Sequence, residues 1–479
     1  MTNPLLQAWD TPFQMPPFDV ITDDHFAPAF AHAMDSARAN IQAIADNSDA
    51  PTFANTIEAL ERADEALDRV LSVFFNVAGA DSNPKREELQ REFSPKLSAY
   101  SSEISMNAAL FARIASLWDA RETLDLSDEQ QRVLMLRHRG FVRSGALLSG
   151  AAADRLTEVK NRLAVLGTQF TQNQLGDERA WFMHLSDGEI TSAQSAAQEV
   201  GVDGYVITTS RSLITPFLQF STRRDLRERA YLAMAARGAN GNANDNRGIA
   251  AETLALRQER ATLLGYRSFA DYKLETEMAK TPGAVRELLM QVWRPARAAA
   301  QADAKILTGM MHSDGVNGDL EPWDWRYYAE KRRKVEHDLD EAALKPYLQL
   351  ERMIDAAFSC ASRLFGLEFR PLQTALYHSD ARAWEVLRDG KHFAVFVGDY
   401  FARGSKRSGA WCSAMRNQQK LAGDIRPIVV NVCNFAKPAP GSPALLSYDD
   451  ARTLFHEFGH ALHQILSNVT YDSISGTSV

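Results

Sequence analysis

The chain has 479 residues, a hydrophobic content of 45%, a charged content of 24% and a formal net charge of −8. This composition predicts a soluble globular protein with a sizeable core. The acidic balance argues against nucleic acid or an anionic membrane as a partner, because both need a basic surface. No apolar run reaches the length of a membrane span, and residues 1–20 lack the basic and apolar regions of a signal peptide. Three cysteines (Cys360, Cys412 and Cys433) fit a reducing compartment. We therefore expect a cytoplasmic monomer without disulfides, in which Cys412 and Cys433 are small buried residues.

Helical periodicity dominates the chain up to about residue 390. Residues 55–77, 154–170, 224–238 and 251–266 carry apolar side chains every three to four positions, which predicts amphipathic helices. Asn55 or Thr56 is the expected N-cap of the first helix, and glycines end the last two. Polar stretches at 238–248 and 312–325 predict loops. The apolar stripe of the first helix consists of Ile57, Leu60, Leu67, Val70, Leu71 and Phe74.

Beyond residue 390 the pattern changes from helix to strand. Residues 391–411 and 426–435 are rich in β-branched and aromatic side chains, which predicts strands, and residues 437–443 form a loop. A helix then begins at Tyr448, after a capping-box-like pair of Ser447 and Asp450, and should end near Ser467. The predicted fold class is mainly α, with a small sheet before this helix. Its expected apolar face consists of Leu454, Phe458, Ala461, Leu462 and Ile465.

The last predicted helix contains HEFGH, with histidines at 456 and 460 and a glutamate at 457. Residues four apart project from one face of a helix, so both imidazoles can reach one zinc ion at about 2.0–2.1 Å. Glu457 is rotated by about 100° from His456, which places it beside the metal, where it can act as a general base. The alternative is a helix whose histidines cap or pack and bind nothing.

A catalytic zinc ion requires a third protein ligand, and the residues leave its identity open. His463 shares the helix face but lies about 10 Å along the axis from His456, so it fits a packing role better. The chain has His463 and Leu466 where the metzincin pattern needs glycine and histidine, which excludes that class. Asp472 is the one acid after His460, and its support is weak. Upstream acids such as Glu368 and Glu385 are also candidate third ligands, but no known ligand spacing relates them to His456 and His460.

The sequence around the motif resembles the M3 family of zinc metallopeptidases, the thimet oligopeptidase group, and within it the peptidyl-dipeptidase branch. The similarity covers essentially the whole chain, and FHEFGHALH is far more specific than the two histidines and glutamate alone. The segments that carry it are PPFDVITDDHFAPAF, PTFANTIEALERA, ATLLGYRSFADYKLETEMAKTP, EPWDWRYYAEKRR, HDLDEAALKPY, LFGLEF, GDYFARGSKRSGAW, VNVCNFAKPAPGSPALLSYDDARTLFHEFGHALH and YDSISGTSV.

The resemblance implies a two-lobed, helical zincin-type fold around a deep channel that admits short peptides and excludes folded proteins. It divides the chain into an N-terminal helical region, residues 1–220, and a catalytic region, residues 221–479. His456 and His460 would bind one zinc ion, and Glu457 would be the general base. The implied reaction releases C-terminal dipeptides, with internal cleavage of the oligopeptidase A kind as the alternative.

The same resemblance places the third zinc ligand on a glutamate about 29 positions after the first histidine, roughly six residues beyond Val479. We therefore expect the catalytic region to be incomplete at its C-terminus, and residues 1–479 alone to be inactive and poorly folded. The apolar face of the motif helix should pack in part against helices beyond Val479. For residues 1–479 alone, a non-catalytic helical scaffold is the alternative. Gly409–Trp411 belongs either to an edge strand that pairs with substrate or to an ordinary strand end.

Overall fold

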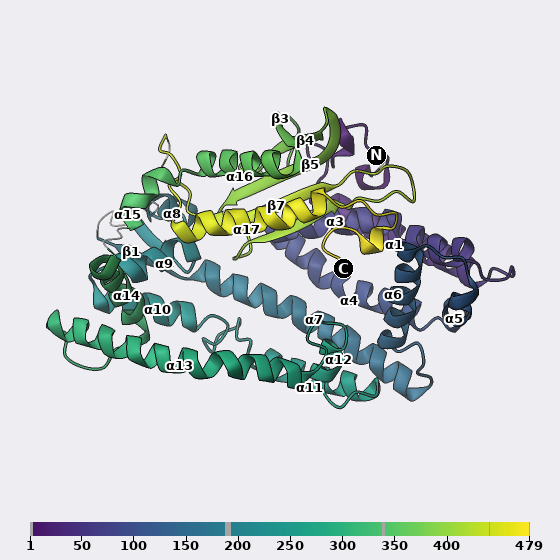
Figure 1. Ribbon diagram of the computed structural model, residues 1–479, viewed down its shortest axis with the longest axis horizontal. Helices are drawn as coiled ribbons and strands as arrows, with labels where there is room; N and C mark the ends of the chain where they lie inside the picture. The colour runs from purple at the N-terminus through teal and green to yellow at the C-terminus, as the bar shows by residue number, and fades with distance from the viewer. Residues whose placement is uncertain (1–2, 187–192, 338–340, 440, 479) are drawn as a thin grey trace. The chain divides into compact units, whose positions relative to one another are not determined.

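The computed structural model describes residues 3–186, 193–337, 341–439 and 441–478, and most of its elements are α-helices (Figure 1). The predicted mainly α fold class is therefore confirmed. Contacts within the chain define two units, residues 1–168, 351–433 and 452–479 in the first and residues 169–350 and 434–451 in the second. The expected boundary between an N-terminal helical region, residues 1–220, and a catalytic region, residues 221–479, stays a prediction. None of the described helices combines the length and the apolar character that a membrane crossing would require.

The N-terminal part of the first unit is helical because its apolar side chains recur every three to four residues. Phe26 and Phe30 lie one turn apart on α1, and each ring meets Phe74 of α3 at a centroid distance of 5.1 Å. Such edge-to-face pairs add to the stabilisation that burial provides. The helices are α1 (Phe26–Ala45), α2 (Ala59–Ala63), α3 (Glu65–Ala80), α4 (Pro84–Ser105), α5 (Ala108–Ala120), α6 (Asp128–Ser144) and the start of α7 (Ala151–Ala180).

The helix predicted over residues 55–77 is in fact three segments. A π-helix (Phe53–Glu58) leads into α2, and the non-helical backbone of Asp64 separates α2 from α3. The predicted N-cap was wrong, because Thr52 caps the segment by accepting a hydrogen bond from the Asn55 amide at 3.0 Å. The Asn55 side-chain oxygen in turn accepts a hydrogen bond from the Thr52 amide at 2.8 Å, which completes a capping box. The predicted apolar stripe is buried, with Leu71 partly so.

A five-stranded sheet in the order β3-β4-β5-β7-β6 forms the other part of the first unit. Three of its strands were not predicted: β3, β4 and, apart from Trp411, β6. In β3 and β4, charged residues such as Glu368 and Arg388 interrupt the apolar pattern. One sheet face packs against Met15 and Ala80 from the N-terminal part of this unit. The strands are β3 (Leu367–Leu372), β4 (Arg382–Arg388), β5 (Lys391–Phe401), β6 (Trp411–Arg416) and β7 (Ile428–Phe435).

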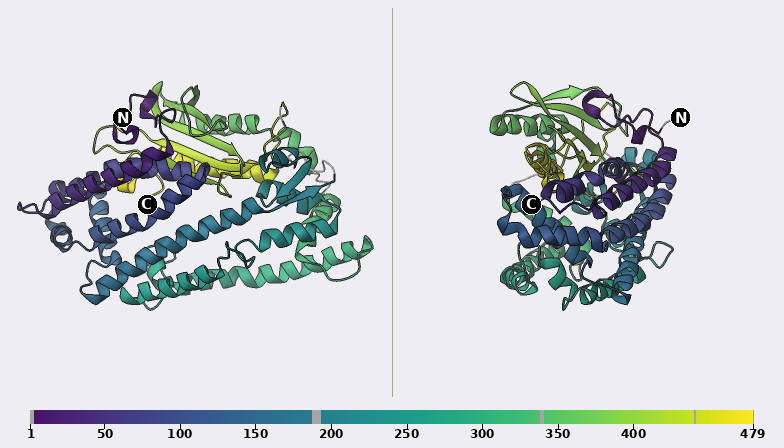
Figure 2. Two further views of the ribbon diagram at one scale, coloured as in Figure 1. Left: turned by 180° about the vertical axis from the view of Figure 1, so that it is seen from behind. Right: turned by 90° about the vertical axis from the view of Figure 1, so that its right-hand side faces the viewer.

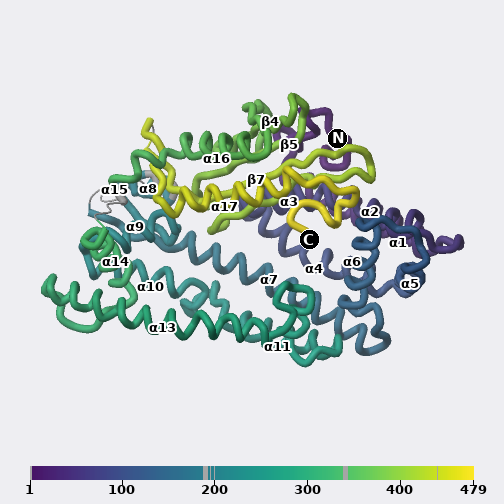
Figure 3. The backbone as a smooth tube through the Cα atoms, in the orientation of Figure 1, coloured from purple at the N-terminus to yellow at the C-terminus, as the bar shows by residue number. Residues whose placement is uncertain are grey.

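Two helices, α16 (Leu350–Phe365) and α17 (Tyr448–Ile465), lie beside the sheet (Figures 1 and 3). The α17 helix begins where predicted and ends two residues earlier than predicted. The Asp450 amide donates to the Ser447 hydroxyl at 3.0 Å, and the Ser447 amide donates to the Asp450 carboxylate at 3.2 Å. The small sheet expected before the motif helix is thus confirmed, as is the helix itself. Residue 440 of the loop predicted over 437–443 lies outside the described residues.

The apolar face of α17 was predicted to pack in part against helices beyond Val479, but residues of this chain already bury most of it. Leu454, Phe458, Ala461 and Ile465 are buried, and Leu462 is partly buried. The Phe458 ring lies 5.5 Å from Phe396 of β5 and 5.7 Å from Phe358 of α16, centroid to centroid. The first unit therefore holds the motif helix through an aromatic core of its own.

The second unit contains a two-stranded antiparallel sheet and further helices. The α10 and α11 helices stop shortly before Gly238 and Gly265, which have φ of 71° and 83°, as the sequence predicts. The α13 helix is long (Figure 2). It contains Pro295 and continues beyond it. The elements are β1 (Phe182–Leu185), α8 (Ala193–Glu199), β2 (Tyr205–Thr208), α9 (Arg211–Phe220), α10 (Arg224–Ala235), α11 (Arg247–Leu263), α12 (Phe269–Leu274), α13 (Pro282–Ser313), α14 (Pro322–His337) and α15 (Glu341–Leu344).

Candidate metal centre

His456 and His460 converge on one point beside α17. Their Nε2 atoms lie 3.2 Å apart, and their ring planes are nearly perpendicular, at 85°. Both side chains are exposed, so a metal ion and a substrate can reach them. Two nitrogens that each bind one tetrahedral zinc ion at about 2.0–2.1 Å are separated by about 3.3–3.4 Å. The observed pair fits one zinc ion, with its two remaining positions open to another ligand and to water.

Glu457 has a different environment from the histidines on either side of it. Its side chain is buried, with 7% exposure, because it lies on the flank of α17 that meets the sheet. Burial raises the pKa of the Glu457 carboxyl, and the neighbouring imidazoles of His456 and His460 lower it by less. No hydrogen bond from a described residue reaches this carboxylate. The Glu457 carboxylate therefore lies beside the histidine pair, and its oxygens can still accept hydrogen bonds.

Within the part of the chain that the structure describes, no three His, Cys, Asp or Glu side chains gather closely enough to hold a metal ion. His463 is exposed on α17 and stands outside the pair formed by His456 and His460. Asp472, in a short 3₁₀ helix (Asp472–Ile474), is engaged by Asn417 and lies near Glu61 and Arg137 instead. The third ligand of a zinc centre stays a prediction.

The upstream acids considered as ligands have partners elsewhere on the sheet. Glu368 pairs with Arg370 of the same strand at 2.7 Å. Glu385 lies 3.3 Å from the Nδ1 atom of His392 across the β4–β5 pair. Neither belongs to a three-residue cluster that could hold a metal ion.

Cys412 lies next to the candidate centre, which the sequence spacing did not indicate. The Gln464 amide of α17 approaches its Sγ atom at 3.8 Å. Burial raises the pKa of the Cys412 thiol to about 12, and the Glu457 carboxylate adds to the effect. All three cysteines are free and Cys360 is exposed. Cys433 is buried as expected, whereas Cys412 is only partly buried, contrary to the prediction.

Gly409–Trp411 leads into β6, which is an edge strand. The outer edge of β6 is partly occupied by α3 of the same unit. The Asn76 amide donates to the Ala414 carbonyl at 3.1 Å, and the Ser72 hydroxyl donates to the Met415 carbonyl at 2.9 Å. Both contacts lie toward the end of β6, away from Trp411 at its start. Pairing of that part with a substrate stays a prediction.

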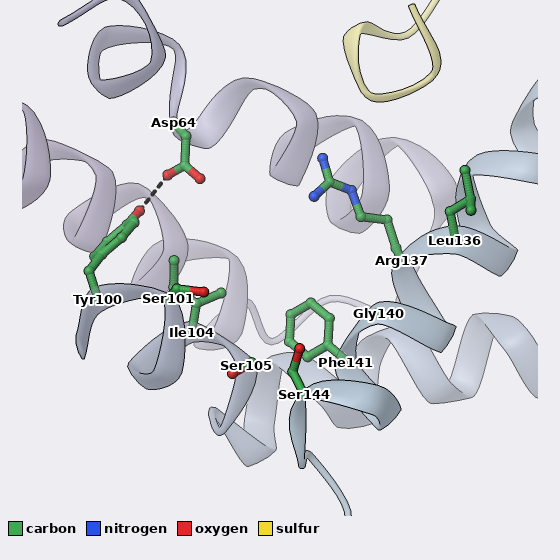
Figure 4. A pocket seen from close by; sticks show the side chains of 10 residues that line it. All are labelled: Asp64, Tyr100, Ser101, Ile104, Ser105, Leu136, Arg137, Gly140, Phe141 and Ser144. Carbon is green, nitrogen blue, oxygen red and sulfur yellow. Dashed lines mark hydrogen bonds between the residues drawn. The ribbon is translucent and has the colours of Figure 1, made fainter. Parts of the chain in front are cut away.

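The first unit also has a cavity of about 300 Å³ that is separate from the histidine pair (Figure 4). The Tyr100 hydroxyl points to Asp64 and donates a hydrogen bond to its carboxylate. Arg137 lines the same cavity and pairs with Glu61 at 2.6 Å. The charged side chains that line the cavity, Asp64 and Arg137, therefore already have partners. Its lining residues are Asp64, Tyr100, Ser101, Ile104, Ser105, Leu136, Arg137, Gly140, Phe141 and Ser144.

An exposed histidine pair with a buried carboxylate between them, on a helix supported by a sheet, defines a candidate metallohydrolase site. The family model for peptidase family M3 matches residues 217–479. The chain is 37% identical to the dipeptidyl carboxypeptidase of Escherichia coli (strain K12), over 99% of this chain and 72% of that protein. It is 29% identical to the oligopeptidase A of the same organism, over 100% of this chain and 72% of that protein. The chain belongs to peptidase family M3 and is a hydrolase of peptide bonds.

Proposed function

We propose that this protein is a zinc peptidyl-dipeptidase that removes dipeptides from the C-termini of short peptides. The observation that carries the proposal is the 3.2 Å separation of the His456 and His460 Nε2 atoms, beside the buried carboxylate of Glu457. In this proposal the two imidazoles are zinc ligands and Glu457 is the general base. The relative named as a dipeptidyl carboxypeptidase is 37% identical, against 29% for oligopeptidase A, which favours dipeptide release over internal cleavage.

The proposed chemistry assigns a separate task to each of these side chains. Zinc held by His456 and His460 would supply Lewis acidity toward the scissile carbonyl. Glu457 takes a proton from the attacking water onto its carboxylate and then delivers it to the leaving amine. A raised pKa suits both steps, because a group that accepts and then returns a proton works best when its pKa lies near the working pH. The buried position of Glu457 also limits the rotamers that its carboxylate can adopt.

The composition supports the remaining parts of the proposal. A net charge of −8 disfavours nucleic acid as a ligand. Three free cysteines suit the reducing conditions of the cytoplasm. We propose a cytoplasmic monomer whose substrates are unstructured peptides.

The test replaces Glu457 with Gln in the protein expressed from its full open reading frame. We expect zinc content near that of the wild type and activity lower by a factor of about 10² or more, because the base is lost and both ligands remain. Zinc is measured by atomic absorption, and cleavage is measured by mass spectrometry of peptides with a free or an amidated C-terminus. The proposal requires loss of dipeptides from the free form, whereas equal cleavage of both forms would support an endopeptidase.

Two further variants serve as controls for this test. His460→Gln should lose zinc and activity together, since it removes a ligand. His463→Gln changes an exposed histidine on the same helix and should leave both unchanged. If Glu457→Gln lost its zinc as His460→Gln does, Glu457 would have to be a ligand. Full activity in excess 1,10-phenanthroline would exclude a metallopeptidase.

A further inference from the structure

Asn431 is a buried polar residue in the middle of β7, among valines and isoleucine. Its side chain is 2% exposed, and its Oδ1 atom is buried without a hydrogen-bond partner. Val430 and Val432 on either side of it are 1% exposed and belong to the apolar core on the other face of the sheet. A buried carboxamide without a partner lowers stability, and an apolar side chain of similar shape would not. The fold alone therefore gives no reason for an asparagine at this position.

The strand register places Asn431 on the sheet face that meets α17. It lies directly opposite Cys412 in the β6–β7 pair, and opposed residues in a sheet project from the same face. The Cys412 thiol contacts Gln464 of α17 and lies within electrostatic range of Glu457. The Asn431 carboxamide is thus next to the side chain that borders the candidate general base.

Glu457 and Asn431 complement each other chemically. Both are buried, with exposures of 7% and 2%, and neither has a hydrogen-bond partner among the described residues. A carboxylate accepts hydrogen bonds and a carboxamide both donates and accepts them. The neighbouring aromatic core of Phe396 and Phe458 makes this region apolar, which strengthens any hydrogen bond formed there.

We propose that Asn431 is a positioning residue of the peptidase site, which fixes the Glu457 carboxylate through one bridging water molecule. The water donates one hydrogen bond to Asn431 Oδ1, the atom without a partner, and the other to a Glu457 oxygen. The inference rests on the proposed function, because it assigns Asn431 to the base of that reaction. Asn431 itself touches neither the substrate nor the metal. Its effect is to hold the proton-accepting oxygen of Glu457 in one orientation.

The test compares Asn431→Leu with the wild type in the protein expressed from its full open reading frame. We expect kcat to fall about tenfold, as loss of outer-shell partners does at metal sites, with KM and zinc content unchanged. After removal of zinc with a chelator, the variant should unfold at the same temperature as the wild type or at a higher one, since the change removes a buried acceptor that has no direct protein partner and places an apolar side chain in an apolar region. This unfolding measurement needs no activity.

Val430→Thr is the matched control, because it changes the neighbouring residue of β7 on the opposite sheet face. It buries a hydroxyl in an apolar core, so it should lower the unfolding temperature and leave kcat unchanged. The inference is overturned if Asn431→Leu keeps its full kcat, or if its metal-free form unfolds at a lower temperature, as Val430→Thr does. An inactive wild type would refute the proposed function, whereas an active wild type with an equally active Asn431→Leu variant would refute this inference alone.

Discussion

Asp399 and Lys406 form an ion pair from which solvent is fully excluded. Both side chains are 0% exposed, and Lys406 Nζ lies 2.7 Å from an Asp399 oxygen. Lys406 also donates to the Cys433 carbonyl of β7 at 2.9 Å, and Arg403 donates to Asp399. Burial lowers the pKa of Lys406 to about 8, while the charge of Asp399 opposes that shift. The pair therefore holds the segment between β5 and β6 against the sheet.

We expect Asp399→Asn to lower the free energy of unfolding by about 3–5 kcal/mol, because it leaves two buried cations without their counter-charge. Urea titration at pH 7 measures the change. Glu368→Gln is the control, since it breaks an ion pair whose side chains are 55% and 56% exposed. That change should cost less than about 1 kcal/mol. Equal losses for the two variants would contradict the assigned role of burial.

At the scale of single residues, the sequence predicts which side chains meet when they lie on one helix, and does not predict it when they come from different strands. The meeting of the His456 and His460 side chains was predictable because one helical turn separates them, while their role as zinc ligands stays a proposal. The meeting of Asn431 and Cys412 was not predictable, because strand pairing brings them to α17 from other parts of the chain. No spacing rule within a single sequence reports such a register.

At the scale of elements, α17 was predictable because its cap, its apolar stripe and its motif agree. The same reasoning missed β3 and β4, whose apolar pattern is interrupted by charged residues, and nearly all of β6. It also missed the π-helix before α2, since periodicity cannot distinguish a π-turn from an α-turn within a few residues. The side-chain cap of α17 was recovered, whereas the Thr52 cap and the backbone break at Asp64 were not.

The capping pair of α17 gives a prediction at this scale. Ser447→Ala removes the acceptor of the Asp450 amide and should lower the free energy of unfolding by about 0.5–2 kcal/mol. Zinc affinity should stay unchanged, because His456 lies more than two turns after the cap and is held by the packed part of the helix. Thermal unfolding and zinc titration measure the two effects.

Ser127→Ala in α6 is the matched control for this variant. The Ser127 hydroxyl accepts from the Gln130 amide at 3.3 Å in a comparable capping box. The two variants should lose similar stability and keep similar zinc affinity. A loss of zinc confined to Ser447→Ala would mean that the first turn of α17 orients the histidines.

At the scale of the whole molecule, composition and periodicity were sufficient to predict the mainly α class. They were insufficient to predict how the chain divides into two units. The two units each combine segments far apart in the sequence, such as residues 1–168 with residues 452–479. An apolar stripe predicts that one face of a helix is buried, but it does not predict which distant element covers that face. For this reason part of the α17 face was predicted to pack against helices beyond Val479, although the sheet and α16 bury most of it.

The carboxylates around Asp68 predict how the stability of the first unit depends on pH. Asp68 is reached by solvent, yet the surrounding protein removes much of its hydration. This loss of hydration, and next the charge of Asp64, raise the pKa of Asp68 from 3.8 to about 7. Asp472 and Glu61 act in the same direction, and Arg137 opposes them. Between about pH 4 and pH 7 the folded state thus binds a proton that the unfolded state does not.

It follows that the contribution of Asp68 to stability is lost as the pH rises through about 7. We expect Asp68→Asn, which keeps the shape and removes the charge, to raise the free energy of unfolding at pH 8 and to change it less at pH 5, where the native carboxyl is protonated. Urea titrations of both proteins at the two pH values measure the difference, with the wild type at pH 5 as the reference. The opposite order, with the variant less stable at pH 8, would mean that Arg137 dominates and that Asp68 is ionised to the benefit of the fold.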